Sequence, residues 1–370
     1  MPVSVSSSPV VREQTFQVLQ RTSRLGGRRK GAAAASALAL ALLVQACSAP
    51  SAPVTRTKQL PFALCSLTLV DHATDATFDA CFKRIDEILA RFNMYSPDSE
   101  ISAVNRAAGA GPVTVSADFL SAVHQGLELA RETDGMFDPT VGPLVKLWAV
   151  ESKNPRVPDP ADIKAALQLI GWKDVVVDDS ARTVALARRG MTLDFGALLK
   201  GFAAVETGRV LSSRGVKNAI VDVGGSVLVL GSRPGGDPWR VGIQSPDAPR
   251  GTSLGVVDVR DMVVNTSGSY EQFFVQRGRR YQHIMDPHTG YPVDNGVTSV
   301  TVIASRLQNA DGPSLSILAL GASRGLDLAA RLGVDVVIVV NHRIYMTEGA
   351  RRLFTLVDPS YEVAAGAPEK

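Results

Sequence analysis

The sequence of 370 residues predicts an α+β domain in which mixed β-sheets are flanked by helices. Apolar side chains recur at helical spacing over 78–92 and 120–130, whereas apolar runs typical of buried strands occupy 216–223 and 336–340. Because both periodicities occur in one chain, helices packed against sheets are the architecture we expect.

The individual elements follow from local patterns. The first helix is predicted from apolar residues three and four positions apart, namely Phe78, Cys81, Phe82, Ile85, Ile88, Leu89 and Phe92. The same spacing over 120–130 predicts a second helix. Residues 175–177 and 183–186 flank an Asp-Asp-Ser turn and predict a hairpin. We expect 351–357 to pair with the strand at 336–340 and extend the sheet.

The chain is expected to hold one large domain. A Ser/Ala/Pro segment at 48–53 precedes roughly 300 residues whose hydrophobic content of 45% is ample for a sizeable core. We see no internal repeat and no second Pro/Ser-rich linker. The sequence therefore predicts a linker over 47–58, a domain over 59–358 and a flexible tail over 359–370.

Residues 1–46 have the layout of an export signal. Basic residues between 21 and 30 precede an apolar run over 31–44, which is shorter than the ~20 residues of a bilayer span. The order Leu43-Val44-Gln45-Ala46-Cys47 resembles a bacterial lipobox, which implies an acylated Cys47 and a periplasmic domain anchored to the lipid bilayer. An uncleaved anchor, an ordinary signal with an incidental cysteine and a twin-arginine signal are the alternatives.

The basic character of the chain resides in this signal. Residues 1–46 hold six of the 39 Lys and Arg and one of the 36 Asp and Glu, so the net charge changes from +3 to −2 without them. Nothing in the remainder predicts a nucleic-acid surface. Cys65 and Cys81 are too few for a thiolate metal cluster. Cys81 is expected to be a small buried hydrophobe, with a Cys65–Cys81 disulfide as the alternative.

Segment 281–292 gathers two histidines, a carboxylate and a Pro/Gly turn after strand-like sequence. A histidine on a loop titrates near neutrality and suits proton transfer, although a hydrogen-bonded turn explains the same residues. Two other polar clusters close the predicted helices. Cluster 93–102 contains Tyr95, which can stack on a flat ring or cap the core. Cluster 133–144 offers backbone amides that can hydrogen-bond the edge of a pyrimidine-like ligand ring, although Gly135 is also typical of an ordinary helix C-terminus.

Three further clusters lie at element ends. Segment 193–202, at a strand-to-helix junction, combines helix-start amides with Lys200 and suits a pyrophosphate, although it lacks the spacing of a Walker loop. Segment 221–226 ends a strand with Gly224 and Gly225, which fits close approach of a ligand or of another strand. Segment 309–316 starts a helix with Asp311. Its oxygens suit Mg²⁺, and ordinary N-capping explains them equally.

Taken in order, these clusters resemble one family, the FAD:protein FMN transferases (ApbE family), over nearly all of residues 60–358. The segments that carry the resemblance are Tyr95 to Ile101, Thr133 to Leu144, Leu193-Asp194 with Lys200-Gly201, Gly224-Gly225, Thr266 to Glu271, His283 to Pro292 and Ala310-Asp311. The resemblance implies an α+β fold related to T-fold proteins. It also implies Mg²⁺-dependent transfer of FMN from FAD to a Thr or Ser hydroxyl of a flavoprotein, with release of AMP.

Site residues are carried over from the family position by position. Tyr95 would stack on the isoalloxazine, and Thr133, Asp134 and Gly135 would line the flavin pocket. Asp194, Lys200 and Met285 match FAD contacts. His283 matches the base that deprotonates the acceptor, which suits a histidine of ordinary pKa. Ala197, through its carbonyl, together with Asp311 and Ser314 matches the Mg²⁺ ligands.

The chain departs from the family pattern in two places. Leu315 stands where the family carries a Thr beside the metal, and segment 62–69 lacks a usual Met-Gly-Thr. Smaller departures are Val205, Ser226 and Ser269, where Asp is common. A hydrolase that splits FAD into FMN and AMP and a non-catalytic FAD-binding lipoprotein therefore remain alternatives.

Overall fold

A nine-stranded sheet forms the centre of the fold in the computed structural model, which describes residues 52–61, 63–305, 311–366 and 368. All neighbouring strands are antiparallel except the last pair, β15 and β17. In spatial order the strands are β1 (Val54–Gln59), β2 (Leu64–Leu69), β6 (Ala219–Val223), β7 (Ser226–Leu230), β10 (Met262–Gly268), β13 (Val297–Ser305), β14 (Asp335–Val340), β15 (Arg343–Met346) and β17 (Glu362–Val363).

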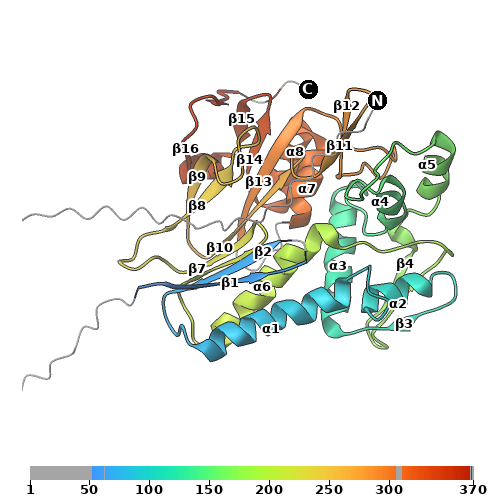
Figure 1. Cartoon of the computed structure of the whole chain (residues 1–370), viewed down its shortest axis with the longest axis horizontal. Coiled ribbons are helices and arrows are strands. Elements are labelled where there is room, and N and C mark those ends of the chain that lie inside the picture. Colours follow the sequence, from blue (N-terminus) through green and yellow to red (C-terminus); the bar gives the residue numbers. More distant parts are fainter. Residues whose placement is uncertain (1–51, 62, 306–310, 367, 369–370) are drawn as a thin grey trace, which may run out of the picture.

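Helices cover one face of this sheet (Figure 1). Helix α6 packs on β6 and β7, α7 on β10 and β13, and α8 on β14, while α1 packs on the outside of α6. The main apolar core lies between these helices and the sheet. The bounds are α1 (Asp75–Phe92), α6 (Gly196–Ser213), α7 (Asp311–Leu320) and α8 (Ala322–Leu332). The prediction of a mixed α+β fold is therefore confirmed.

The opposite face of the sheet is covered by a three-stranded sheet of β16 (Phe354–Leu356), β9 (Ser253–Val259) and β8 (Trp239–Gln244). A second apolar cluster, which includes Val227 and Val229, fills the space between the two sheets. Leu228 and Leu230 of the same strand point into the main core. Successive side chains of a strand alternate between faces, so residues 227–230 of β7 are all apolar because both faces of this strand are buried.

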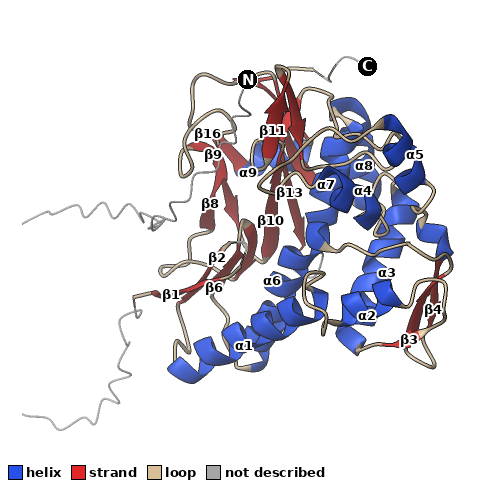
Figure 2. Cartoon of the chain, turned by 45° about the vertical axis from the view of Figure 1, so that its right-hand side comes forward, coloured by secondary structure: helices blue, strands red, loops and turns tan. Residues whose placement is uncertain are grey.

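A side lobe completes the fold (Figure 2). It contains α2 (Glu100–Arg106), α3 (Ala117–Glu132), α4 (Gly142–Trp148), α5 (Pro160–Leu167) and the sheet of β3 (Val113–Thr114), β5 (Thr183–Leu186) and β4 (Val175–Asp178). A separate hairpin of β11 (Phe273–Gln276) and β12 (Arg279–Gln282) packs on α4 and α5 through Phe274 and Tyr281. A short 3₁₀ turn, Trp172–Asp174, precedes β4.

The periodic segments form the predicted elements. The stripe over 78–92 is the buried face of α1, which begins where the Thr74 hydroxyl accepts a hydrogen bond from the Thr77 amide at 3.2 Å. The second stripe lies in α3, capped in the same way by Ser116. Strands β4 and β5 pair in register as the predicted hairpin. Cys65 and Cys81 are both buried free thiols, so the expectation for Cys81 is confirmed.

The predicted domain edges are wrong in two places. Residues 54–58, expected in a linker, belong to β1, which pairs with β2. Alternation places Arg56 and Lys58 toward α1, where they form ion pairs with Asp75 and Asp86. The tail expected over 359–370 contains β17, and Tyr361 is 4% exposed. Its phenol donates a hydrogen bond to Asp247 at 2.7 Å.

The pairing predicted for 351–357 is also wrong. Residues 348–353 form the short helix α9 (Glu348–Leu353), and β16 then pairs with β9 rather than with β14. Thr347 caps α9 by accepting the Ala350 amide at 3.3 Å, and β15 occupies the position beside β14. The expected signal and Cys47 lie outside the described residues. Within the described chain, no helix combines the length and apolarity that crossing a membrane requires.

Candidate active site

The start of α6 anchors the candidate site. Phe195, the residue before the helix, packs edge-on against Phe92 and Phe119, with ring centroids 5.7 and 5.9 Å away. Asp194 receives the Gly196 amide on its carboxylate at 2.8 Å, and its own amide donates to the Pro139 carbonyl at 2.8 Å. These contacts fix the helix start against the loop that follows α3. Burial raises the pKa of Asp194.

Lys200 lies one turn into α6 and connects it to the Gly-Gly bend between β6 and β7. Its ammonium donates to the Gly224 carbonyl at 3.2 Å. The charge of Lys200 also reaches two carboxylates, since it lowers the pKa of Asp222 and of Asp311 while burial raises both. A single cation therefore lies among groups that come from three distant segments of the chain.

Asp311, the first residue of α7, is 3% exposed. Its carboxylate accepts the Gly201 amide at 2.5 Å and the Ser226 hydroxyl at 2.6 Å. Gly201 lies four residues after Ala197, so its amide is the group that a regular helix directs toward the Ala197 carbonyl. The Asp311 carboxylate is consequently held beside the first turn of α6, where Ala197 lies.

Ser314 lies one turn further along α7 and is completely buried. Its hydroxyl oxygen lies 2.5 Å from Asn265 Oδ1, 2.7 Å from Ser267 Oγ and 2.7 Å from the Asp311 carbonyl. Asn265 also donates to Ser226 at 2.9 Å. Helix α7 and strand β10 thus share one buried polar network around the Asp311 carboxylate.

This donor set fits a hard cation. Asp311, Ser314 and Asn265 all offer oxygen atoms, which are the ligands that Mg²⁺ prefers. In the described part of the chain, no group of three or more His, Cys, Asp or Glu residues could hold a metal. Within the network of α7 and β10, a bound Mg²⁺ would find the Asp311 carboxylate and otherwise neutral oxygens. Leu315 packs against the main apolar core and adds no oxygen.

His283 follows β12 directly. Its backbone amide and its Nδ1 both approach the Gln272 carbonyl oxygen, at 3.1 and 3.2 Å. Because a carbonyl oxygen only accepts, Nδ1 carries the proton and Nε2 keeps its lone pair. Burial is the main effect that lowers the pKa of His283 to about 4, and the charge of Lys200 acts in the same direction. The imidazole is therefore neutral at pH 7.

The rest of the segment after His283 forms a turn. Met285 is buried among the apolar residues under α4 and α5, and pairs with Pro292 in an isolated bridge. The Asp286 carboxylate accepts the His288 amide at 2.8 Å, so it stabilises the turn. His288 Nε2 lies 3.2 Å from the Asp134 carbonyl, which connects the turn to the loop after α3.

Residues Thr133, Asp134 and Gly135 form the exit of α3. The Thr133 hydroxyl donates to the Leu129 carbonyl at 2.8 Å and accepts the Phe137 amide at 3.0 Å, so this side chain serves the helix end. Asp134 and Gly135 have φ of 52° and 78°, which aims the chain toward His288. Thr133 and Asp134 line a cavity of about 280 Å³ together with Arg324, Asp327 and Arg331.

Tyr95 is 84% exposed on the loop after α1. Partial burial of its hydroxyl, then the charges of Glu151 and Asp194, raise the pKa of Tyr95. Glu151 was not among the residues predicted from the sequence. Burial and the charge of Asp194 raise its pKa, and it hydrogen-bonds Gln272, whose carbonyl holds His283. Glu151 lies in an ordinary polar loop, so no local sequence signal distinguishes it.

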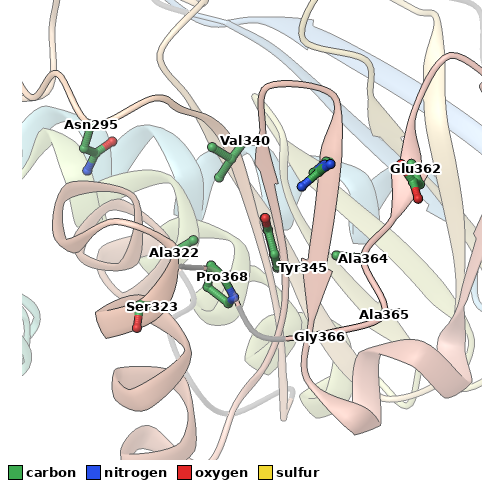
Figure 3. Close-up of a pocket in the computed structure, with 11 residues that line it drawn as sticks. Asn295, Ala322, Ser323, Val340, Tyr345, Glu362, Ala364, Ala365, Gly366 and Pro368 are labelled. Carbon is green, nitrogen blue, oxygen red and sulfur yellow. The ribbon is translucent and has the colours of Figure 1, made fainter. Parts of the chain in front are cut away.

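A larger cavity lies elsewhere. It has a volume of about 480 Å³ and is lined by residues of β15, β17 and the start of α8, including Arg343, Tyr345 and Glu362 (Figure 3). None of the predicted site residues line it. Most of the predicted residues lie instead around α6, α7 and the segment that follows β12, while Tyr95 and residues 133–135 lie on the loops after α1 and α3.

The sequence of this chain matches a known protein family. The model of the ApbE family matches residues 63–338. The chain belongs to the ApbE family. Within this ApbE chain, the matched range contains the start of α6, the α7–β10 network and His283. The resemblance predicted from the sequence is thereby confirmed.

Relatives and solved structures agree with the ApbE assignment. The chain is 33% identical to a FAD:protein FMN transferase of Klebsiella pneumoniae (strain 342), over 79% of this chain and 90% of the relative. It is 33% identical to that of Treponema pallidum, over 75% and 81%. The ApbE protein of Thermotoga maritima matches with a TM-score of 0.75 at 28% identity, covering 82% of this chain and 99% of that one. The flavin transferase ApbE of Vibrio cholerae matches with a TM-score of 0.74 at 26% identity, covering 82% and 100%.

Proposed function

We propose that this chain transfers FMN from FAD to a Thr or Ser hydroxyl of a target flavoprotein and releases AMP. The observation that carries the proposal is the neutral imidazole of His283 in the field of Lys200, a residue of the helix that the Asp311 network holds in place. A proton acceptor, a cation and helix-start amides are what attack on a pyrophosphate requires. The assigned activity of the ApbE relatives agrees with this chemistry.

The reaction balances in one displacement. The acceptor oxygen bonds to the phosphorus of the FMN half, the bond from that phosphorus to the bridging oxygen breaks, and AMP leaves with the bridging oxygen. Nε2 of His283 takes the hydroxyl proton, since Nδ1 keeps its own hydrogen on the Gln272 carbonyl. Lys200 places its charge where the negative charge of the leaving phosphate develops.

Mg²⁺ belongs to the proposal as well. Asp311, Ser314 and the carbonyl of Ala197 would hold it, and Asn265 is a further oxygen within the same network. When bound, Mg²⁺ would neutralise the charge of the pyrophosphate. FAD binding is assigned to Tyr95, Asp194, Lys200 and Met285. Asp134 and Gly135, on the loop after α3, complete this set. The buried Thr133 hydroxyl serves the helix end, so its contribution would be to position that loop.

We also propose that residues 1–46 export the protein and that an acylated Cys47 anchors it to the periplasmic face of the membrane. The lipobox-like sequence supports this localisation. Metabolic labelling of cells with a clickable palmitate analogue should label the wild-type protein. Labelling that persists in a Cys47→Ala variant would contradict acylation at Cys47.

One incubation separates the proposed activity from its alternatives. The protein is mixed with FAD, Mg²⁺ and a protein acceptor, and flavin is followed on the acceptor and in solution. Flavin fluorescence that stays with the denatured acceptor, together with AMP, supports transfer. Free FMN with AMP would assign hydrolysis instead, and bound intact FAD without either product would leave only binding.

A further inference from the structure

Asn265 is a buried polar residue at the centre of the α7–β10 network. It lies in β10, between β7 and β13 of the central sheet, and is 2% exposed. Its Oδ1 accepts the Ser314 hydroxyl at 2.5 Å, and its Nδ2 donates to the Ser226 hydroxyl at 2.9 Å. Ser314 in turn lies 2.7 Å from the Asp311 carbonyl, and Ser226 lies 2.6 Å from the Asp311 carboxylate. Asn265 therefore closes a ring of polar contacts around Asp311.

The contacts of Ser314 involve more oxygen atoms than hydrogens. Its hydroxyl oxygen lies within 2.7 Å of Asn265 Oδ1, of the Asp311 carbonyl oxygen and of Ser267 Oγ. Ser314 and Ser267 each have one hydrogen to donate, whereas the amide and backbone carbonyl oxygens only accept. Both hydroxyl hydrogens together can serve all but one of these contacts. One carbonyl oxygen therefore faces Ser314 with no hydrogen between the two atoms.

Turning the Asn265 amide over does not remove this shortage. Its Nδ2 would then donate to Ser314, and its Oδ1 would face the Ser226 hydroxyl. Ser226 has one hydrogen, which it donates to the Asp311 carboxylate. In either orientation, two oxygen atoms of the network lie together with no hydrogen between them. A bound cation would satisfy this arrangement, because hard cations are held by clustered oxygen atoms.

The oxygen atoms also suit Mg²⁺ in number and spacing. Neighbouring ligands of an octahedral Mg²⁺ with bonds of ~2.1 Å are about 2.9 Å apart, so a small expansion of the contacts around Ser314 would admit the ion. Leu315 packs against the main apolar core and supplies no oxygen where the family carries a Thr. In the described chain, the Oδ1 of Asn265 has Ser314 as its hydrogen-bonding partner and keeps a second lone pair.

We propose that Asn265 is a Mg²⁺ ligand of this chain, and that its Oδ1 replaces the side-chain oxygen that Leu315 lacks. The Asp311 carboxylate and the Ser314 hydroxyl would complete the protein oxygens on this side of the ion. The assignment rests on the Mg²⁺ site of the proposed function. Asn265 stands one position before the segment Thr266 to Glu271, so the family resemblance does not assign it.

Metal binding without an acceptor protein tests this assignment. The full chain with FAD is titrated with MnCl₂, free Mn²⁺ is followed by its EPR signal, and Mg²⁺ affinity is obtained by competition, because both ions prefer oxygen ligands. Asn265→Ala should weaken the binding of both ions at least tenfold. Asn265→Asp should strengthen it at least fivefold, because a second carboxylate adds negative charge to the site. Unchanged affinity in the two variants would overturn the assignment.

A second substitution separates a ligand from a residue that only supports the fold. Leu315→Thr in the Asn265→Ala background should return the Mn²⁺ affinity to within threefold of the wild type, since the new hydroxyl supplies the missing oxygen. A purely structural defect would persist, because Thr at this position removes apolar packing. Weak binding that persists in the double variant, or weaker binding in Asn265→Asp, would assign Asn265 a structural role and overturn the proposal.

Asn218→Ala is the matched control. Asn218 also makes polar contacts, with Asp71 at 2.9 Å and with the Ser232 amide at 2.8 Å. It precedes β6, whereas the Gly-Gly bend beside Lys200 follows that strand. The Mn²⁺ affinity of Asn218→Ala should therefore stay within twofold of the wild type. An equal loss of affinity in Asn218→Ala and Asn265→Ala would overturn the assignment.

FMN transfer by the same variants separates this assignment from the proposed function. Transfer with the same Mg²⁺ dependence in wild type and Asn265→Ala would remove Asn265 from the site and keep the reaction. Metal binding that depends on Asn265, in a wild type that transfers no FMN, would remove the reaction and keep the ligand.

Discussion

His283 owes its chemistry to its surroundings. The Gln272 carbonyl fixes the proton on Nδ1, and burial lowers the pKa of His283 to about 4. An unperturbed histidine would be partly protonated below pH 7 and would lose its lone pair. Glu151 contributes to these surroundings, because it hydrogen-bonds Gln272, the residue whose carbonyl holds His283.

Replacement of the imidazole should remove the base without removing the FAD site. His283→Ala is expected to lower the rate of FMN transfer by ~10²–10⁴-fold, the usual contribution of a general base, with FAD affinity within a factor of three. Transfer is followed by in-gel flavin fluorescence, and FAD binding by quenching of flavin fluorescence. His288→Ala is the control, because the exposed His288 contacts Asp286 of its own turn and the carbonyl of Asp134 rather than that of Gln272. Near-normal transfer by His283→Ala would remove its assignment as the base.

The pH dependence follows from the lowered pKa of His283. Transfer at saturating FAD should stay within twofold between pH 8 and pH 6, because the imidazole is neutral throughout this range. A rate that falls with a midpoint near pH 6.5 would contradict the buried state of His283.

The same lowered pKa affects the stability of the fold. Its effect is opposite in sign to that of a histidine stabilised by an acidic partner. The unfolded chain binds this proton below pH 6.5 and the native chain only near pH 4, so the group lowers stability as the pH falls through that window.

At the scale of elements, the sequence predicts what depends on local periodicity. Helices α1 and α3 and the β4–β5 hairpin have amphipathic or turn patterns that identify them without a partner. Strand β1 and strand β17 are short and polar, and only pairing with β2 and β15 makes them strands. The polar clusters at helix starts are recognisable in the sequence. That Ser226, Asn265 and Asp311 share one network is not, because α7 and β10 meet only through the tertiary fold.

The packing of α7 should control the position of Asp311. A Cβ on Gly312 would lie 2.3 Å from Leu129 Cδ2 and 2.6 Å from Leu198 Cδ2, so in Gly312→Ala either these two leucine side chains rearrange or α7 shifts away from α3 and α6. We expect a loss of ~1–3 kcal/mol in stability and weaker Mg²⁺ binding by isothermal titration calorimetry.

Gly255→Ala on β9 serves as the matched control for this prediction. A Cβ there would lie 2.2 Å from Phe354 Cε2, so this variant should also lose stability while keeping its Mg²⁺ affinity, because β9 lies in the three-stranded sheet on the face opposite to α7. If Gly312→Ala had the same thermal unfolding midpoint as the wild type, the tight packing of α7 would be contradicted.

At the scale of the whole molecule, the two ends of the described chain close the central sheet. Strand β1 forms one edge and β17 the other, and Tyr361 joins the cluster between the sheets. The ring of Tyr361 stacks on His342 at 4.8 Å, and its hydroxyl contacts Asp247. The C-terminal segment is therefore part of the domain rather than a tail.

Removal of this segment should destabilise the fold. Tyr361→Ala is expected to lower the free energy of unfolding by ~3–5 kcal/mol, the usual cost of deleting a buried aromatic side chain. Urea unfolding followed by tryptophan fluorescence measures it, with truncation after Gly366 as a control that leaves β17 in place. An unchanged unfolding midpoint in Tyr361→Ala would show that the segment does not support the sheet.

The central claim is that Lys200, the Asp311 network and His283 together transfer FMN to a protein hydroxyl. Mass spectrometry of the acceptor after incubation with FAD and Mg²⁺ tests it most directly, combined with chromatography of the released nucleotide. We expect one FMN moiety esterified to a Thr or Ser, one AMP for each modified acceptor, and neither product with His283→Ala. An unmodified acceptor in the presence of free FMN and AMP would contradict the claim.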